Sequence, residues 1–82
     1  MQWEKSDRKE PISSKNLRVY RCGPYTLETE PMGEIDGDQM WNASIMRDHW
    51  IGSVEVWGVG SEQDMITLCE KAARATGLLK QK

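Results

Sequence analysis

Residues 37–77 decide the fold, and they read GDQMWNASIMRDHWIGSVEVWGVGSEQDMITLCEKAARATG. Within them, residues 40–46 and 51–57 are rich in β-branched and aromatic side chains, which favour strands. Only residues 47–50 separate these two stretches. The segment therefore predicts a β-hairpin.

A helix is predicted directly after this hairpin. Ser61 offers its hydroxyl oxygen to the free backbone amides of a first helical turn, where Glu62 and Asp64 face the positive end of the helix. Gly77 supplies the left-handed residue at which helices commonly end. Between these ends, apolar spacing predicts that the core-facing stripe consists of Met65, Leu68, Cys69, Ala72 and Thr76.

A second hairpin is expected earlier in the chain. Residues 17–22 and 25–30 predict two short strands joined through Gly23-Pro24, which suits a tight reversal. Residues 31–38 are predicted as a loop. The expected fold is thus α+β: a four-stranded antiparallel sheet of two hairpins with one C-terminal helix packed on one face, in the order ββββα.

The length of the chain limits the number of domains that it can form. With 82 residues, 38% of them hydrophobic and 29% charged, it holds one domain with a small core. We expect residues 1–16 to be a polar tail or loop, with Trp3 tucked against the core, and residues 17–82 to be a single domain. Modest stability follows from this size, and a homodimer would raise it.

No segment predicts contact with a membrane. No apolar run approaches the roughly 20 residues that cross a bilayer. The first ten residues also lack the apolar stretch of a signal peptide. We therefore expect a cytoplasmic protein with no membrane partner.

Alternation along the strands assigns side chains to two faces of the sheet. The face expected to meet the helix carries Leu17, Val19, Tyr25, Leu27, Trp41, Ala43, Ile45, Val54 and Val56. The uncovered face carries Arg18, Tyr20, Thr26, Glu28, Asn42, Ser44, Ser53, Glu55 and Trp57. Exposed Tyr20 and Trp57 indicate a recognition surface, because such rings supply contact area at low entropic cost. The alternative is that the N-terminal tail or a second copy of the chain covers Trp57.

Charge is distributed unevenly although the net charge is only −2. Residues 1–22 carry six basic and three acidic side chains (+3), residues 23–70 carry ten acids and one base (−9), and residues 71–82 carry four bases (+4). An acidic middle disfavours phosphate binding, which depends on Lys and Arg. A solvated loop or an interface with a basic protein explains it better.

Candidate metal and phosphate motifs are incomplete. Glu34, Asp36 and Asp38 alternate near Gly37, but they lack the Asp spacing and the distant Glu of a calcium loop. Residues 58–60 precede the helix without the Lys and Ser/Thr of a phosphate loop. We therefore expect no metal and no cofactor.

Candidate catalytic residues are also isolated. His49, the one histidine, falls at the predicted hairpin turn, where polarity accounts for it. The two cysteines make no disulfide framework, and Cys69 on the apolar stripe is expected to act as a small hydrophobe. Nothing in the sequence assembles a nucleophile, a base and an oxyanion site, so we do not expect an enzyme.

A loose pattern across most of the chain consists of WE at 3–4, RCGPYTL at 21–27, WNAS at 41–44 and CEKAA at 69–73. This pattern resembles small phage and prophage accessory proteins. The resemblance implies a virus-derived protein, and such proteins include anti-CRISPR and other host-defence inhibitors, which act by occupying a host protein's surface. It carries over no functional residue.

The leading hypothesis is a non-enzymatic protein-binding module, a phage accessory protein that inhibits or redirects a host protein, for example in a CRISPR-Cas defence system. Its partner is expected to present a basic surface, and the residues expected to bind it are Tyr20, Glu28, Glu30, Glu34, Asp36, Asp38, Glu55 and Trp57. The alternative is a small nucleic-acid-associated domain that uses the basic tail and stacks bases on Tyr20 and Trp57.

Overall fold

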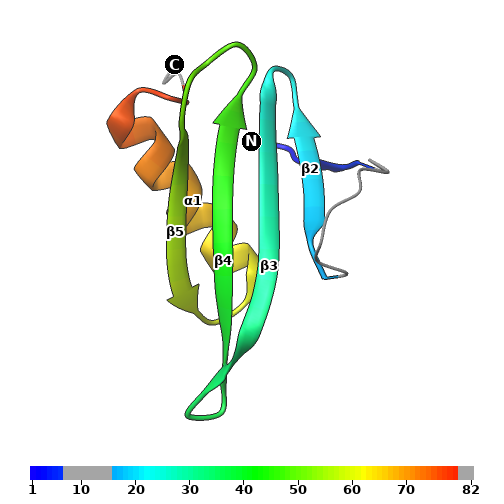
Figure 1. The fold of residues 1–82 in the computed structure, drawn as a ribbon, viewed down its shortest axis with the longest axis vertical. Helices are drawn as coiled ribbons and strands as arrows, with labels where there is room; N and C mark the ends of the chain where they lie inside the picture. Colours follow the sequence, from blue (N-terminus) through cyan, green and yellow to red (C-terminus); the bar gives the residue numbers. More distant parts are fainter. Residues whose placement is uncertain (7–15, 80–82) are drawn as a thin grey trace.

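The computed structural model describes residues 1–6 and 16–79, which form one antiparallel sheet and one helix (Figure 1). The elements are β1 (Glu4–Lys5), β2 (Arg18–Cys22), β3 (Tyr25–Ile35), β4 (Asp38–Arg47), β5 (Ser53–Val59) and α1 (Glu62–Thr76). Their order in the sheet is their order in the chain. The predicted α+β class is confirmed, with five strands in place of four. Residues 7–15 of the expected tail and residues 80–82 lie outside the described part.

The additional strand comes from the segment expected to be a tail. Glu4 and Lys5 pair with Arg21 and Tyr20 of β2. Trp3 packs partly buried against the core, as predicted, and its indole N–H donates to Oε2 of Glu70 at 2.6 Å. Both ends of the described chain therefore contribute to one structural unit.

The expected loop at residues 31–38 is wrong, because β3 and β4 continue through it as a long hairpin. Asp36 and Gly37 form its turn with φ values of 53° and 84°. Positive φ at both positions is the requirement of a type I′ turn, for which Asp-Gly is a preferred pair. A register shift between Pro31 and Gly33 accommodates the proline within β3. The hairpin consequently projects past the helix at the lower end of Figure 1.

The helix begins and ends where the sequence predicts. The Ser61 hydroxyl accepts from the Asp64 amide, the Asp64 carboxylate accepts from the Ser61 amide, and Gly77 follows the helix with φ of 85°. Its buried stripe is Met65, Ile66, Cys69 and Ala73. Leu68 is 42% exposed, and Thr76 is also exposed, so the predicted stripe was rotated toward the wrong side.

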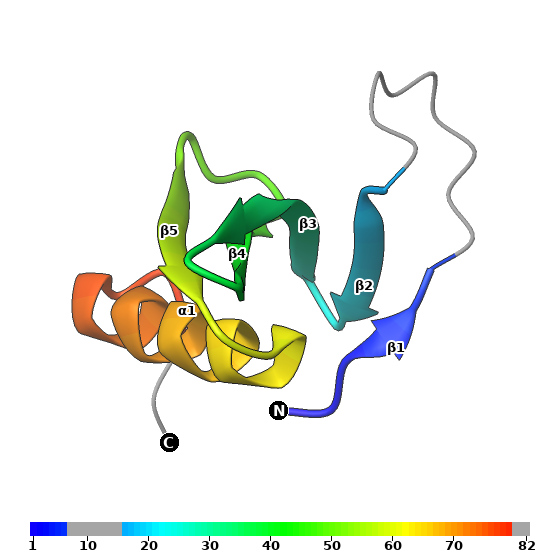
Figure 2. The ribbon, with the colours of Figure 1, turned by 90° about the horizontal axis from the view of Figure 1, so that it is seen from below.

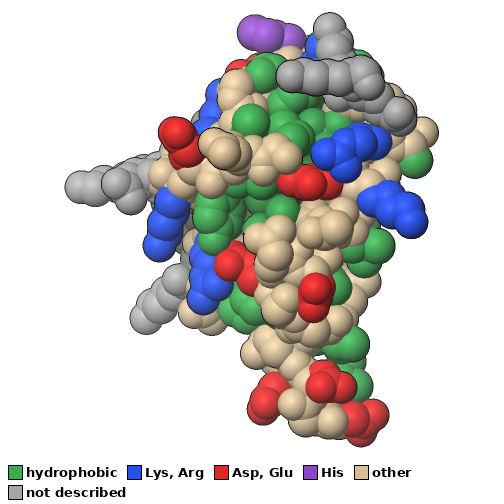
Figure 3. Space-filling view, turned by 180° about the vertical axis from the view of Figure 1, so that it is seen from behind, with side chains coloured by type: hydrophobic (Ala, Val, Ile, Leu, Met, Phe, Trp, Pro, Cys, Tyr) green, Lys and Arg blue, Asp and Glu red, His purple; other side chains and the backbone are tan. Residues whose placement is uncertain are grey.

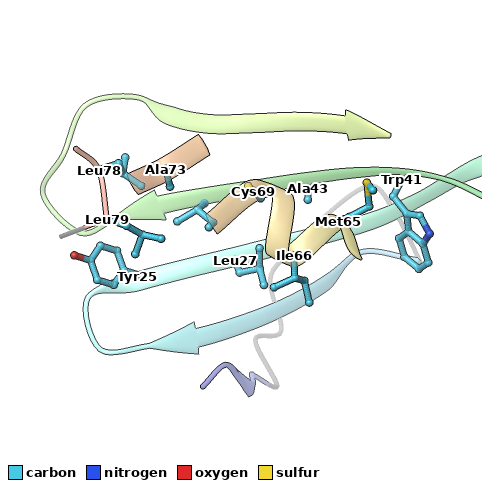
Figure 4. Packing of buried hydrophobic residues seen from close by; sticks show 11 residues of the cluster. Tyr25, Leu27, Trp41, Ala43, Met65, Ile66, Cys69, Ala73, Leu78 and Leu79 are labelled. Carbon is cyan, nitrogen blue, oxygen red and sulfur yellow. The ribbon is translucent and has the colours of Figure 1, made fainter. Parts of the chain in front are cut away.

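The core lies between the sheet and α1, where Figure 4 shows Leu27, Ala43 and Ile66 among its members. Leu78 and Leu79, which follow α1, are buried there as well. Burial raises the pKa of Cys69 to about 12, with the nearby Glu70 and Glu55 carboxylates adding to the effect, so this thiol stays protonated as a core residue.

The sheet faces are confirmed for β3, β4 and β5 but reversed for β2. The two-residue turn at Gly23-Pro24 pairs Cys22 with Tyr25 and Tyr20 with Leu27. Partners in an antiparallel ladder share a face, so Tyr20 faces the helix and Val19 faces away from it. The sequence assignment placed Val19 with Tyr25, a combination that a two-residue turn does not permit.

The face of the sheet opposite α1 is called the open face below. Its members are Val19, Arg21, Thr26, Glu28, Glu30, Asn42, Ser44, Met46, Ser53, Glu55 and Trp57, of which Val19 and Thr26 are buried. Figure 2 shows α1 on the other side of the sheet, beneath β4 and β5.

Candidate protein-binding surface

Strand pairing brings four of the predicted partner-binding residues into two adjacent rows of the open face. The first row runs from Glu28 through Ser44 to Glu55. The second runs from Glu30 through Asn42 to Trp57, one step nearer the hairpin tip. Because neighbouring strands lie about 4.8 Å apart, the backbones of the outer residues in each row are about 10 Å apart. The two rows form a compact patch of three carboxylates and one tryptophan.

Trp57 is the apolar member of this patch and lies at its corner, on the edge strand β5. It is 53% exposed, in agreement with its predicted place on the uncovered face. Asn42 lies opposite Trp57 on β4, and its side-chain amide donates to the Val56 carbonyl at 3.3 Å. This hydrogen bond holds the Asn42 side chain beside the indole. A half-exposed indole on the face of a sheet is the kind of side chain that anchors protein interfaces.

Among the described residues, the open face carries a negative charge. Arg21 is its basic member in that part of the chain, and its guanidinium lies 3.1 Å from Oδ2 of Asp48. The same guanidinium donates to the Gly23 carbonyl at 3.1 Å. The Arg21 charge is therefore balanced by Asp48. Glu30 and Glu55, by contrast, pair across the strands with Asn42 and Ser44, which carry no positive charge.

Three other predicted residues lie together at a separate place, the tip of the β3–β4 hairpin. Glu34, Asp36 and Asp38 are all exposed there. The register shift after Pro31 pairs Glu34 with Gln39, so Glu34 leaves the face that carries Glu30. Six residues of extended chain separate Glu30 from Asp36, about 20 Å. Figure 3 shows this acidic tip standing clear of the body of the protein.

Tyr20, the eighth predicted residue, is not on the open face. It lies on the helix side, where its hydroxyl donates to Oε2 of Glu62 at 2.8 Å. Thr29 donates to the same oxygen at 2.7 Å, and Arg18 lies 3.2 Å from the other carboxylate oxygen. The expectation that Tyr20 and Arg18 sit beside Trp57 is therefore wrong.

This cluster of Arg18, Tyr20, Thr29 and Glu62 holds α1 to β2 and β3. Burial alone would raise the pKa of Glu62, but hydrogen bonds from Thr29 and Tyr20 and the charge of Arg18 outweigh it and lower the pKa. The pKa of Tyr20 is raised by burial and by the Glu62 carboxylate. From the sequence, Glu62 was interpreted only as an acid at the N-terminal end of the helix. Tyr20 and Arg18 were not recognised as its partners, because β2 was assigned the wrong face.

Within residues 1–6 and 16–79, no three side chains among His, Cys, Asp and Glu converge to hold a metal ion. None of the helical structure described there is long and apolar enough to cross a membrane. Comparison with protein-family models, curated proteins and solved structures finds no match to this chain.

Proposed function

We propose that the chain is a non-enzymatic protein-binding module that docks its open face on a basic surface of another protein. The observation that carries the proposal is the pair of rows in which Glu28, Glu30 and Glu55 share one sheet face with the half-exposed Trp57. Acids around an aromatic anchor favour a partner that offers Lys or Arg around an apolar pocket.

The hairpin tip contributes at longer range in this proposal. Its three carboxylates project from the body and act on the approach of a basic partner, because charges outside the contact change association more than affinity. The open face then supplies the contacts that hold the complex together.

The nucleic-acid alternative has less support. Its two stacking groups were Tyr20 and Trp57, and they lie on opposite faces of the sheet. An acidic face around Trp57 also repels phosphates, on whose neutralisation nucleic-acid affinity depends.

The resemblance to phage and prophage accessory proteins supplies the class of partner. On that basis the module acts in a host cytoplasm and occupies the surface of a host protein, such as a component of a CRISPR-Cas defence system.

A matched pair of tryptophan variants tests the proposal. Tagged wild type, Trp57→Ala and Trp50→Ala would be used to capture proteins from a host lysate, followed by mass spectrometry. Trp50 is 45% exposed but stands outside the strands, beside the Arg47 guanidinium. The proposal expects a basic protein that the wild type and Trp50→Ala retain and Trp57→Ala loses. Equal retention by all three would contradict it.

A further inference from the structure

β5 forms one edge of the sheet and presents a row of backbone groups. The Gly60 amide donates to the Gln39 carbonyl at 3.0 Å, which fixes the hydrogen-bonding phase between β4 and β5. With that phase, Val54 and Val56 turn their N–H and C=O groups toward β4. The same groups of Ser53, Glu55, Trp57 and Val59 point outward, and no strand of the described chain pairs with them.

Within the described residues, this edge has few of the features by which proteins usually block an open edge. β5 contains seven residues, SVEVWGV, with no Pro, no Lys and one charged side chain, Glu55. The described pairings show no bulge between β4 and β5. By contrast, the opposite edge is only the two-residue strand β1. A long, regular edge of this kind is a template for another strand.

The helix provides a floor for such a strand. Figures 1 and 2 both show the C-terminal part of α1 projecting beyond β5. Leu68, 42% exposed, lies on this side: a Cβ built on Gly58 would be 4.0 Å from Leu68 Cδ2. Ala72 and Ala75 follow Leu68 at helical spacing and share its side of α1.

We propose that a second copy of this chain occupies the edge, with two β5 strands pairing antiparallel about a two-fold axis at Val56. In this register Glu55 lies opposite the second copy's Trp57, and Ser53 lies opposite its Val59. Roughly eight ladder hydrogen bonds would satisfy the outward backbone groups. The two Glu55 residues of the pair are diagonal and not directly opposite each other, so the repulsion between their carboxylates is weaker than in a direct cross-strand pair.

The helices favour the same symmetric partner. In this antiparallel pairing, the projecting C-terminal end of each α1 lies over Gly58 of the other copy. It is then next to the other copy's Leu68. The large Leu68 of one copy then meets the small Ala72 and Ala75 of the other. Large against small on both sides of the axis is the self-complementarity that a two-fold interface requires. The result is a continuous ten-stranded sheet with both helices on one face.

Light scattering after size exclusion tests this dimer. The wild type is expected at twice the 9.4 kDa chain mass. Glu55→Pro removes an outward N–H while leaving the β4 ladder intact, and Leu68→Lys places a charge at the helix contact. Each should raise the dimer dissociation constant by at least about tenfold. Thr67→Lys, on the exposed side of the same helix, is the matched control and should remain dimeric.

Cysteine cross-linking tests the register without relying on a weakened variant. In a Cys22→Ser background, Val56→Cys brings two thiols together at the axis, within the Cα separation that a disulfide spans. Mild oxidation should convert most of it to a covalent dimer, whereas Ser53→Cys should not cross-link. A monomeric wild type at high micromolar concentration would overturn the proposal. So would a dimer that withstands both β5 and Leu68 variants, or cross-linking at residue 53 in place of 56.

Discussion

Tyr20 donates its phenolic hydrogen to Oε2 of Glu62 across 2.8 Å and so ties β2 to the first turn of α1. Thr29 donates to the same oxygen, which adds β3 to the junction. One half-buried carboxylate therefore joins three elements of a domain with a small core.

Replacing Glu62 by Gln should destabilise the protein by about 1–3 kcal/mol at pH 7, because the donors lose a charged acceptor. The lowered pKa of Glu62 sets the pH dependence. Its contribution is fully present above 4.5, the ordinary value, and is lost as the pH falls through the lower folded value. Urea unfolding of both proteins from pH 7 to pH 3 measures the difference, which should shrink in acid. A difference that stays constant with pH would contradict this role, and Glu34→Gln at the hairpin tip is the control.

Truncation of two tryptophans on neighbouring strands should destabilise the protein to very different extents. Trp41 is 7% exposed, and its indole N–H donates to the Gly60 carbonyl at 2.8 Å. Trp41→Ala should cost about 3–5 kcal/mol, enough to unfold so small a domain. Trp57→Ala on the open face should cost less than about 1 kcal/mol. Thermal unfolding followed by circular dichroism compares them, and a stable Trp41→Ala protein would mean that the faces are reversed.

The helix cap is the third stability test. Ser61→Ala removes the acceptor for the Asp64 amide and should cost about 0.5–2 kcal/mol. Ser53→Ala, an exposed serine at the start of β5, should change the unfolding free energy little. Equal losses in the two variants, measured by urea unfolding, would be inconsistent with a capping role.

Local signals in the sequence were sufficient for the two ends of the helix and for the face of most strands. Ser61 and Gly77 act within one turn of chain, and alternation in β4 separates Trp41 and Ile45 from Asn42 and Ser44. Asp36-Gly37 is a preferred pair for a tight hairpin turn, yet residues 31–38 were predicted as a loop. The bulge that accommodates Pro31 depends on pairing with β4, which residue preferences alone do not reveal.

The sequence predicted the residues of the candidate site correctly only on strands whose side chains it had assigned to the correct face of the sheet. Glu28, Glu30, Glu55 and Trp57 lie together because β3, β4 and β5 have the expected faces. Tyr20 was misplaced because β2 carries apolar residues on both faces, and its phase is set by the length of the Gly23-Pro24 turn. Ile66 was missed because the core contacts of α1 depend on how the helix crosses the sheet.

The hairpin tip should affect how fast a partner arrives. Reversing Glu34 and Asp36 to Lys should slow association with a basic partner and weaken the dependence of its rate on salt. Dissociation should change little, because the tip lies about 20 Å from the open-face rows. Binding kinetics over a salt series measure both rates once a partner is captured. If this variant associated with the partner at the wild-type rate at low salt, the hairpin tip would have no role in binding.

The dissociation rate of the captured partner from wild type, Trp57→Ala and Trp50→Ala tests the central claim most directly. We predict that Trp57→Ala remains folded and releases the partner at least about tenfold faster. Truncating an aromatic hot-spot residue typically costs about 2 kcal/mol or more of binding free energy. Trp50→Ala should match the wild type. Equal dissociation rates for all three proteins would contradict the claim that the open face is the binding surface.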